Sequence, residues 1–311
     1  MSIKNQTRVT EFILLGFGDL HSFNIILFLF FLIVFLFTVM GNLLIILLVS
    51  LTVQLQSPMY YFLSHLSFTD LVISISTLPN MLGAILLGGI KMSYLGCITQ
   101  LYFICSSTIT ECYLLPVMSY DRYLAICNPL RYTSVMDYKY RICLSVWPWL
   151  FGFTLDLIGV LGVSNYNFCR DNIIDHFYCD VSPLQKLSCS DSSLVELEIF
   201  LFSLPIFILP CGFIIVTYVF IVLTIVRIPT TTGKQKAFST CSSHFIVVGT
   251  FYGTLIAKYM IPSKGQSLLI NKIVSLLHTV FTPLFNPIIY SLRNQDIKMA
   301  LKKLSDQYLA L

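Results

Sequence analysis

Residues 118–132 read MSYDRYLAICNPLRY, and they close an apolar run that begins near Cys97. At a rise of about 1.5 Å per residue, a helix from Cys97 to Arg122 spans roughly 37 Å, which exceeds the ~30 Å hydrocarbon core of a bilayer. An arginine at such a depth is costly unless it pairs, reaches the interface or has a function, and Asp121 is a ready local partner. We therefore expect a membrane-spanning helix with a cysteine at one face and an Asp-Arg pair at the other.

The composition points to a membrane protein. The chain has 311 residues, of which 56% are hydrophobic and 11% charged, whereas a soluble domain carries about 25% charged residues. Continuous apolar runs of membrane-spanning length recur along the chain, so we expect an all-α membrane protein. The net charge of +4 is small and is not concentrated in a basic block, and nothing favours a nucleic-acid partner.

The apolar runs predict seven transmembrane helices and a short surface helix. The tail after Asn294 places apolar residues opposite lysines at helical spacing, which is typical of an amphipathic helix lying on membrane lipid. We expect three parts: an N-terminal segment at 1–24, a seven-helix domain at 25–293 and a tail at 294–311. The helices around the central one are expected at 25–51, from Pro58 onward, and at 142–163, 194–226, 236–260 and 268–292.

Charges and cysteines orient the chain in the membrane. Seven crossings put the two termini on opposite sides, and the side of Arg122 holds the larger share of the 19 Lys and Arg residues, as expected of a cytoplasmic face. The N-terminus is then extracellular, and Asn5-Gln6-Thr7 is a glycosylation sequon there. The same outer face carries four cysteines, which allow three disulfide pairings that the sequence alone leaves open. They are Cys97, Cys169, Cys179 and Cys189.

Residues 118–132 closely resemble the helix 3 signature of the G-protein-coupled olfactory (odorant) receptors, which belong to the rhodopsin-like family. Taken alone, Asp121-Arg122-Tyr123 is more often a simple ion pair at a helix end. Further matches follow in order, however, at Gly41-Asn42 and at residues 58–70, 174–180, 236–244 and 283–294. The resemblance implies a plasma-membrane receptor, not an enzyme, that binds volatile molecules and activates a heterotrimeric G protein, of the olfactory stimulatory type, which raises cAMP.

The resemblance also assigns disulfides and a switch. It implies the pairs Cys97–Cys179 and Cys169–Cys189. It implies that Asp121 holds Arg122 in the resting state and that Arg122 is released to meet the G protein. Pro116 departs from the family pattern, and a proline there should kink helix 3. The implied switch residues are Asp121, Arg122, Tyr123, Tyr218, His244, Asn286, Pro287 and Tyr290.

Two carboxylates are expected near the membrane midplane. Counting from the inner face places Asp70 and Glu111 at similar depth, with Asn286 nearby. Two such acids cannot both stay ionised and unpaired. Either they hold a sodium ion, for which hard oxygen ligands are suited, or they form a protonated pair. No other cofactor is expected. Asp156 is a further membrane acid, either functional or reaching water or a neighbouring helix.

Depth counting from the inner motifs also gives a candidate ligand site. Its members are apolar and aromatic with a few hydroxyls, which suits a small, mostly apolar molecule oriented by one or two hydrogen bonds. No Asp lies near Ile104, which argues against an amine receptor, and no Lys between Lys272 and Arg293 offers a Schiff base. The candidates are Ile104, Cys105, Thr108, Phe202, Ser203, Ile206, Phe207, Tyr252, Leu255, Ile256, Tyr259, Leu276 and Thr279.

Two other classes of membrane protein fit less well. An intramembrane aspartyl protease needs two facing aspartates within the membrane, one of them in a Gly-x-Gly-Asp motif. Asp121 lies at the interface, and the one Gly-x-Gly-Asp sequence, Gly16-Phe17-Gly18-Asp19, lies before the first expected membrane helix. A zinc protease needs His-Glu-x-x-His, which is missing. A small transporter or channel predicts an internal repeat with paired broken helices, and the sequence shows no such repeat.

Overall fold

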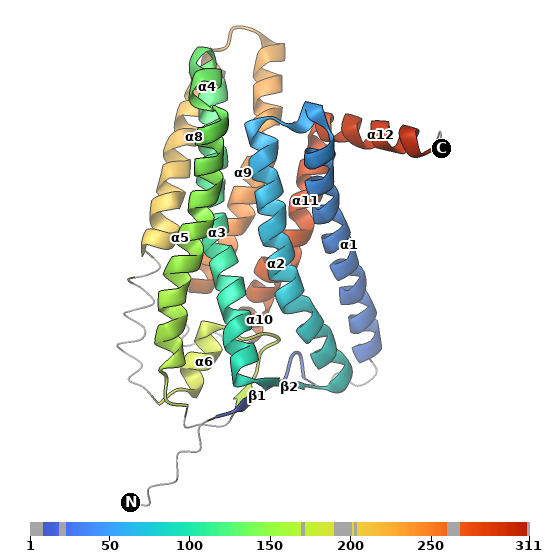
Figure 1. Ribbon diagram of the computed structural model, residues 1–311, viewed down its shortest axis with the longest axis vertical. Helices are drawn as coiled ribbons and strands as arrows, with labels where there is room; N and C mark the ends of the chain where they lie inside the picture. The colour runs from blue at the N-terminus through green and yellow to red at the C-terminus, as the bar shows by residue number, and fades with distance from the viewer. Residues whose placement is uncertain are drawn as a thin grey trace, which may run out of the picture.

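A computed structural model gives the structure of the protein and describes residues 9–18, 23–168, 172–189, 201, 204–259 and 268–309. Within these ranges, seven long helical rods lie side by side in one bundle (Figure 1). Six of the described helices are long and apolar enough to cross a membrane. The more polar α9 packs against α3, α8, α10 and α11 and completes the bundle. The predicted seven-helix fold is confirmed.

The bounds of the helices agree closely with the apolar runs. Helix 5 begins, within the described residues, as a π-helical turn that continues into α8, and helix 7 contains a π-helical turn between α10 and α11. The rods are α1 (Asn24–Leu51), α2 (Pro58–Leu87), α3 (Tyr94–Cys127), α5 (Tyr138–Ser164), Leu204–Ile208 with α8 (Leu209–Arg227), α9 (Thr231–Tyr259), and α10 (Leu268–Leu276) with Leu277–Phe281 and α11 (Thr282–Arg293). Two short helices, α4 (Pro129–Val135) and α6 (Val181–Leu187), lie between rods.

Local chemistry sets several helix ends. Pro58 stands at the start of α2, where its missing N–H costs nothing. At the other end of α2, Gly88 takes a left-handed conformation with φ of 67°, which favours glycine. The side chain of Ser93 caps α3 by accepting a hydrogen bond from the N–H of Gly96, and Asp137 caps α5 through the N–H of Tyr140.

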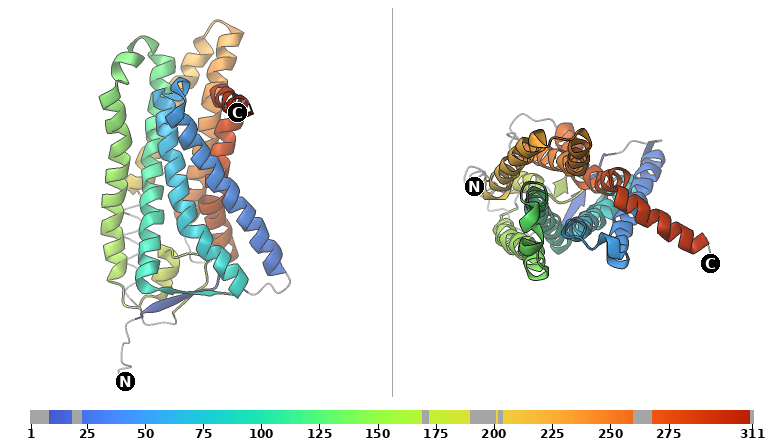
Figure 2. Two further views of the ribbon diagram at one scale, coloured as in Figure 1. Left: turned by 45° about the vertical axis from the view of Figure 1, so that its right-hand side comes forward. Right: turned by 90° about the horizontal axis from the view of Figure 1, so that it is seen from above.

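The two ends of the bundle differ. One end, here named the disulfide end, carries Cys97 and a small sheet, and the other, the Arg122 end, carries α4 and α12 (Gln295–Leu309), as Figures 1 and 2 show. In the sheet, β1 (Glu11–Leu14) lies between β2 (Ile90–Ser93), its antiparallel neighbour, and β3 (Ile173–Ile174), its parallel neighbour. The sheet, which the sequence analysis did not foresee, therefore joins the N-terminal segment to two interhelical loops.

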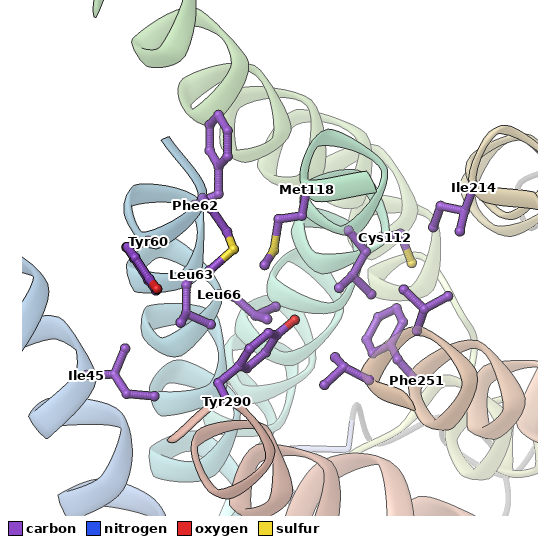
Figure 3. Close-up of a cluster of buried hydrophobic side chains, with 14 of the residues drawn as sticks. Ile45, Tyr60, Phe62, Leu63, Leu66, Cys112, Met118, Ile214, Phe251 and Tyr290 are labelled. Carbon is purple, nitrogen blue, oxygen red and sulfur yellow. The ribbon is translucent and has the colours of Figure 1, made fainter. Parts of the chain in front are cut away.

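The largest buried cluster lies toward the Arg122 end. Figure 3 shows Tyr290 of α11 beside Leu63 and Leu66 of α2. Cys112 and Met118 of α3 belong to the same cluster. The predicted C-terminal surface helix is confirmed as α12, which runs across the direction of the bundle (Figure 1). Its Ile297 is buried in this cluster, whereas Lys298, Lys302 and Lys303 are exposed.

Pro116 does not interrupt α3, which runs unbroken from Tyr94 to Cys127. A proline cannot donate to the carbonyl four residues earlier, which here belongs to Cys112. That carbonyl accepts a hydrogen bond of 2.7 Å from the hydroxyl of Tyr252 in α9 instead. The backbone group that Pro116 leaves unpaired is thereby satisfied from a neighbouring helix.

Candidate functional site

A disulfide ties the loop after α5 to the start of α3. Cys97 and Cys179 are bonded, as the resemblance implied. Gln100, one turn along α3, strengthens this link because its side chain accepts from the N–H of Cys179 at 2.9 Å and donates to the carbonyl of Ser76 at 2.7 Å. Cys189 is also disulfide-bonded, and its expected partner Cys169 lies outside the described residues.

The loop segment 175–180, here named the roof loop, covers the disulfide end of the bundle with buried side chains. Phe177, Tyr178 and Cys179 are fully buried, and His176 and Asp180 are 2% exposed. Two lysines of the bundle hold the loop. The Nζ of Lys258 in α9 lies 3.1 Å from Oδ2 of Asp180, and the Nζ of Lys272 in α10 lies 2.6 Å from Oδ1 of Asp175.

Burial and charge shape the titration of the roof loop. Burial lowers the pKa of His176 to about 4, although Asp180 acts in the opposite direction. Burial also raises the pKa of Tyr178 to about 12, with a further contribution from Asp180. Burial is the largest influence on Asp180 and alone would raise its pKa. The charge of Lys258, together with His176 and the backbone N–H of Val181, outweighs burial and holds that pKa below its usual range. At neutral pH the roof loop therefore contains a neutral imidazole beside an ionised Lys258–Asp180 pair.

Most of the predicted ligand residues that the structure describes turn into the bundle. Phe207 of helix 5 and Tyr259 of α9 stack with ring centroids 5.3 Å apart and an interplanar angle of 15°. The predicted residues that are buried or partly buried are Ile104, Cys105, Thr108, Ile206, Phe207, Tyr252, Leu255, Tyr259, Leu276 and Thr279.

Three predicted ligand residues do not join this group. The side chain of Ile256 is 48% exposed on the outer face of α9. Successive helical residues are turned by about 100°, so a residue adjacent to an inward-facing position can face outward. We therefore leave Ile256 out of the candidate site. Phe202 and Ser203 lie outside the described residues.

His278 is a site residue that the sequence analysis missed. It lies in the π-helical turn of helix 7, is 2% exposed, and its Nε2 lies 3.2 Å from the hydroxyl oxygen of Thr108. That hydroxyl already donates to the carbonyl of Ile104 at 2.8 Å. Hence Nε2 of His278 is the donor to Thr108, and Nδ1 has no hydrogen-bond partner among the described residues. A histidine one residue before the predicted Thr279 was the available signal.

Lys258 and Asp180 were also missed as site residues. Lys258 immediately precedes the predicted Tyr259, and Asp180 immediately follows the bonded Cys179. The sequence analysis did not select Lys258, because depth counting along one helix gives no distance to a loop. A lysine within a helix beside a predicted ligand residue was the signal.

The midplane acids meet in the structure as a polar group. The side-chain amide of Asn286 donates to both carboxylate oxygens of Asp70, at 3.2 and 3.0 Å. Asp70 is 0% and Glu111 1% exposed, and the two carboxyl groups interact electrostatically. Oε1 of Glu111, Oγ of Ser74 and Oδ1 of Asn286 lack hydrogen-bond partners within the described part of the chain. Unpaired hard oxygens around two acids fit a small hard cation.

This group differs from a metal centre built from many strong ligands. Among the described residues there is no cluster of three or more His, Cys, Asp or Glu side chains that could hold a metal ion. Any ion at Asp70 and Glu111 would depend on neutral oxygens for its remaining ligands, which suits an alkali cation better than a transition metal.

Asp156 of α5 is 8% exposed, and its Oδ2 has no hydrogen-bond partner among the described residues. It interacts with the backbone of Ser106 in α3. The close approach of the two helices is possible because Gly152 has no side chain: a Cβ there would lie 2.6 Å from Oγ1 of Thr110. Asp156 thus reaches a partner helix, which agrees with the structural alternative for this residue.

At the Arg122 end, the Asp121 carboxylate has a different partner from the one expected. Oδ1 of Asp121 accepts a hydrogen bond of 2.8 Å from the hydroxyl of Tyr132 in α4. No ion pair within 4.0 Å joins Asp121 to Arg122 in the described structure, where both residues are included. The charge of Arg122 still acts on Asp121, and it also acts on Tyr218, His244 and Tyr290.

Tyr218 of α8 and His244 of α9 form a further contact at this end. The Tyr218 hydroxyl lies 2.7 Å from Nδ1 of His244, and the rings stack at 5.8 Å with an interplanar angle of 7°. The hydroxyl of Tyr290 is buried without a hydrogen-bond partner in the described residues. Residues from α8, α9 and α11 therefore lie within reach of the charge of Arg122 on α3.

Comparisons with known proteins match almost the whole chain to olfactory receptors. A family model described as "Olfactory receptor" matches residues 31–307. Human olfactory receptor 11L1 is 45% identical over 303 residues, which are 97% of this chain and 94% of that receptor. Mouse olfactory receptor 6B9 is 44% identical over 301 residues, which are 97% and 95% of the two chains. Rat olfactory receptor 1f45 is 44% identical over 303 residues, 97% of each chain.

Proposed function

Because this chain belongs to the olfactory receptor family, whose members are G-protein-coupled odorant receptors and not enzymes, we propose that it binds small, mostly apolar volatile molecules within its helix bundle. Binding activates a heterotrimeric G protein of the olfactory stimulatory type and raises cAMP. The observation that carries this proposal is the stacked pair Phe207 and Tyr259, buried or partly buried beside the roof loop. Aromatic surfaces with few polar groups suit an apolar ligand.

The disulfide end faces outward in this proposal, and the Arg122 end faces the cytoplasm. A disulfide between Cys97 and Cys179 supports an oxidising compartment at that end. The positions of the lysines and arginines along the sequence support a cytoplasmic Arg122 end. The same orientation places Asn5, which lies outside the described residues, on the extracellular side, where it can be glycosylated. α12 then lies on the inner lipid surface, with its lysines toward the headgroups.

The proposed mechanism links the two ends through α9. Tyr252 and Tyr259 lie in the part of α9 that carries the candidate ligand residues. His244 belongs to the same helix and lies toward its Arg122 end. A ligand shifts the receptor only by binding one arrangement of the bundle more tightly than the other. The favoured arrangement moves the Arg122 end of α9 outward and exposes Arg122 to the G protein, with Tyr218 and Tyr290 as its partners. Pro205, Pro210 and Pro287 provide places for bending.

We further propose that Asp70 and Glu111 hold a sodium ion, with Asn286 nearby. The unpaired oxygens described above support an ion. The alternative is a protonated, hydrogen-bonded pair, since two buried carboxylates cannot both stay ionised without a cation.

A signalling assay tests the proposed function. Cells that express the receptor with an olfactory stimulatory G protein are exposed to volatile molecules, and cAMP is measured. We expect ligand-dependent cAMP in the wild type and its loss in Arg122→Ala at equal surface expression. The matched control is Lys302→Ala, which removes an exposed positive charge of α12 at the same end and should keep the response. Transport of a volatile solute that survives Arg122→Ala, without any cAMP, would instead indicate a transporter.

A further inference from the structure

Lys258 is a buried cation at the junction of the roof loop and the bundle. Its side chain is 4% exposed, and that of Asp180 is 2% exposed. The Nζ donates a hydrogen bond of 2.6 Å to the hydroxyl of Tyr178 and lies 3.1 Å from Oδ2 of Asp180. A lysine buried to this extent is unusual unless it is paired, and Lys258 is paired with Asp180.

Aromatic rings also lie against the ammonium group. An ammonium carries three N–H donors. One donates to Tyr178, whereas the 3.1 Å contact with Oδ2 of Asp180 is an ion pair without hydrogen-bond geometry. The rings of Tyr178 and Tyr259 flank Nζ, with centroids at 5.2 and 5.0 Å. No acceptor for the third N–H is found among the described residues. A buried donor without an acceptor is costly, so this N–H is available to a ligand.

Lys258 adjoins the candidate ligand residues on several helices. Tyr259, which it flanks, stacks on Phe207 of helix 5. Its charge also acts on Cys105 of α3 and on His278 of helix 7. Both ring nitrogens of His176, on the roof loop, lack hydrogen-bond partners within the described residues although the side chain is buried. Nδ1 of His278 is likewise buried without a partner in this part of the chain, so unpaired polar atoms occur on both the roof loop and helix 7.

Resting on the proposed odorant-receptor function, we propose that the ammonium group of Lys258 is the polar anchor of the ligand site, and that the receptor prefers neutral apolar molecules bearing a carbonyl oxygen, such as ketones and esters. The carbonyl accepts the third N–H, and the apolar body packs against Phe207 and Tyr259. No covalent step is involved.

Charge excludes the other ligand classes. A carboxylate would leave a net negative charge beside Asp180, because the Lys258–Asp180 pair is already neutral as a whole. An alkylammonium would meet the buried ammonium of Lys258 directly. A hydrocarbon of the same length would fill the apolar space but leave the N–H unpaired, and sites built to hydrogen-bond a ligand discriminate against analogues that lack the partner group.

The test uses four probes with closely matched carbon chains: 2-octanone, octane, octanoate and octylamine. Concentration–response curves for cAMP are measured at verified surface expression in the full-length wild type, in Lys258→Met and in the double variant Lys258→Met/Asp180→Asn. The double variant leaves no unpaired buried charge, so it covers the case in which the single variant does not fold. The control is Lys272→Met, which removes the other lysine that binds the roof loop but whose partner Asp175 is 43% exposed.

We expect 2-octanone to be at least tenfold more potent than the other three probes in the wild type. Its potency should fall tenfold or more in the double variant, to that of octane, and remain within threefold in Lys272→Met. Equal potency of 2-octanone in the wild type and the double variant overturns the assignment of Lys258 while leaving the receptor function intact. A preference for octanoate or octylamine overturns the proposed ligand class. Silence toward all four probes, with cAMP responses to other volatiles, also overturns it, whereas silence toward every volatile counts against the proposed function itself.

Discussion

The hydroxyl of Tyr252 in α9 donates a 2.7 Å hydrogen bond to the backbone carbonyl of Cys112 in α3, four residues before Pro116. This is the carbonyl that a helical N–H at position 116 would otherwise bond. A local defect in one helix is thus repaired by a side chain of another. Because Tyr252 is itself one of the candidate ligand residues, the bond also joins α3 directly to the helix that we expect to move.

Replacing Tyr252 with Phe should destabilise the receptor because it leaves the buried Cys112 carbonyl unpaired. The cost of such a group is about 1–3 kcal/mol. In a Pro116→Ala background, the new N–H at position 116 takes over the carbonyl, so the same Tyr252→Phe change should cost clearly less. The melting temperatures of the four purified proteins form a double-mutant cycle that measures this difference. Equal costs of Tyr252→Phe in both backgrounds would show that the hydrogen bond does not compensate for Pro116.

Replacing Tyr132 with Phe should lower the ligand-free activity of the receptor. Asp121 would lose its 2.8 Å hydrogen bond from Tyr132, and the adjacent Arg122 is the nearest charge that can replace it. Hydrogen bonds to charged groups contribute about 1.5–3 kcal/mol, so a shift of roughly tenfold toward the state with Arg122 paired is expected. Basal cAMP at matched surface expression measures it. An unchanged or raised basal signal would mean that Tyr132 does not compete with Arg122 for Asp121.

Patterns along single helices predicted much of this structure. Helix bounds followed from apolar runs, and depth counting from the inner motifs selected Phe207 and Tyr259, which stack on each other. Counting depth does not fix rotation, however, and Ile256 faces outward although its neighbour Leu255 is fully buried. An error of one residue along a helix changes the face that a side chain occupies.

Contacts between a loop and a helix could not be predicted from the sequence. The Lys258–Asp180 pair joins residues that are far apart in the chain and carry no local pattern. The partner of Cys97 was open among three pairings until the family resemblance chose Cys179. The strand at Glu11–Leu14 is too short to show alternation, and it forms because the loops at Ile90–Ser93 and Ile173–Ile174 offer their edges. Tertiary packing, not local preference, determined these features.

Acid should destabilise the roof loop through His176. The folded state lowers its pKa to about 4, from an ordinary value near 6.5, chiefly by burial. Because the unfolded chain binds the proton first as pH falls, stability is lost between about pH 6.5 and 4, by on the order of 3 kcal/mol in total. The charged groups that act on this imidazole are Asp175, Asp180, Lys258 and Lys272.

Melting temperatures at pH 7 and pH 4.5 test this prediction in the wild type and in His176→Gln, which retains a polar side chain but cannot titrate in this range. The drop between the two pH values should be smaller in the variant. If both proteins lose the same stability, the folded state does not lower the pKa of His176 as described, and the acid sensitivity arises elsewhere.

Sodium should stabilise the wild type specifically through Asp70. An ion that binds only the folded state adds RT ln(1 + [Na⁺]/Kd), which is about 2.7 kcal/mol at 100 times Kd. Asp70→Asn removes one of the two carboxylates while retaining a polar side chain beside Asn286, whose amide now lies 3.0 Å from Oδ2 of Asp70. The melting temperature of the wild type should therefore rise with NaCl and that of the variant should not.

Replacing NaCl by KCl at equal ionic strength separates a selective site from screening of surface charges. Equal insensitivity of both proteins to Na⁺ would exclude the ion and leave Asp70 and Glu111 as a protonated pair, since two buried carboxylates without a cation cannot both remain charged.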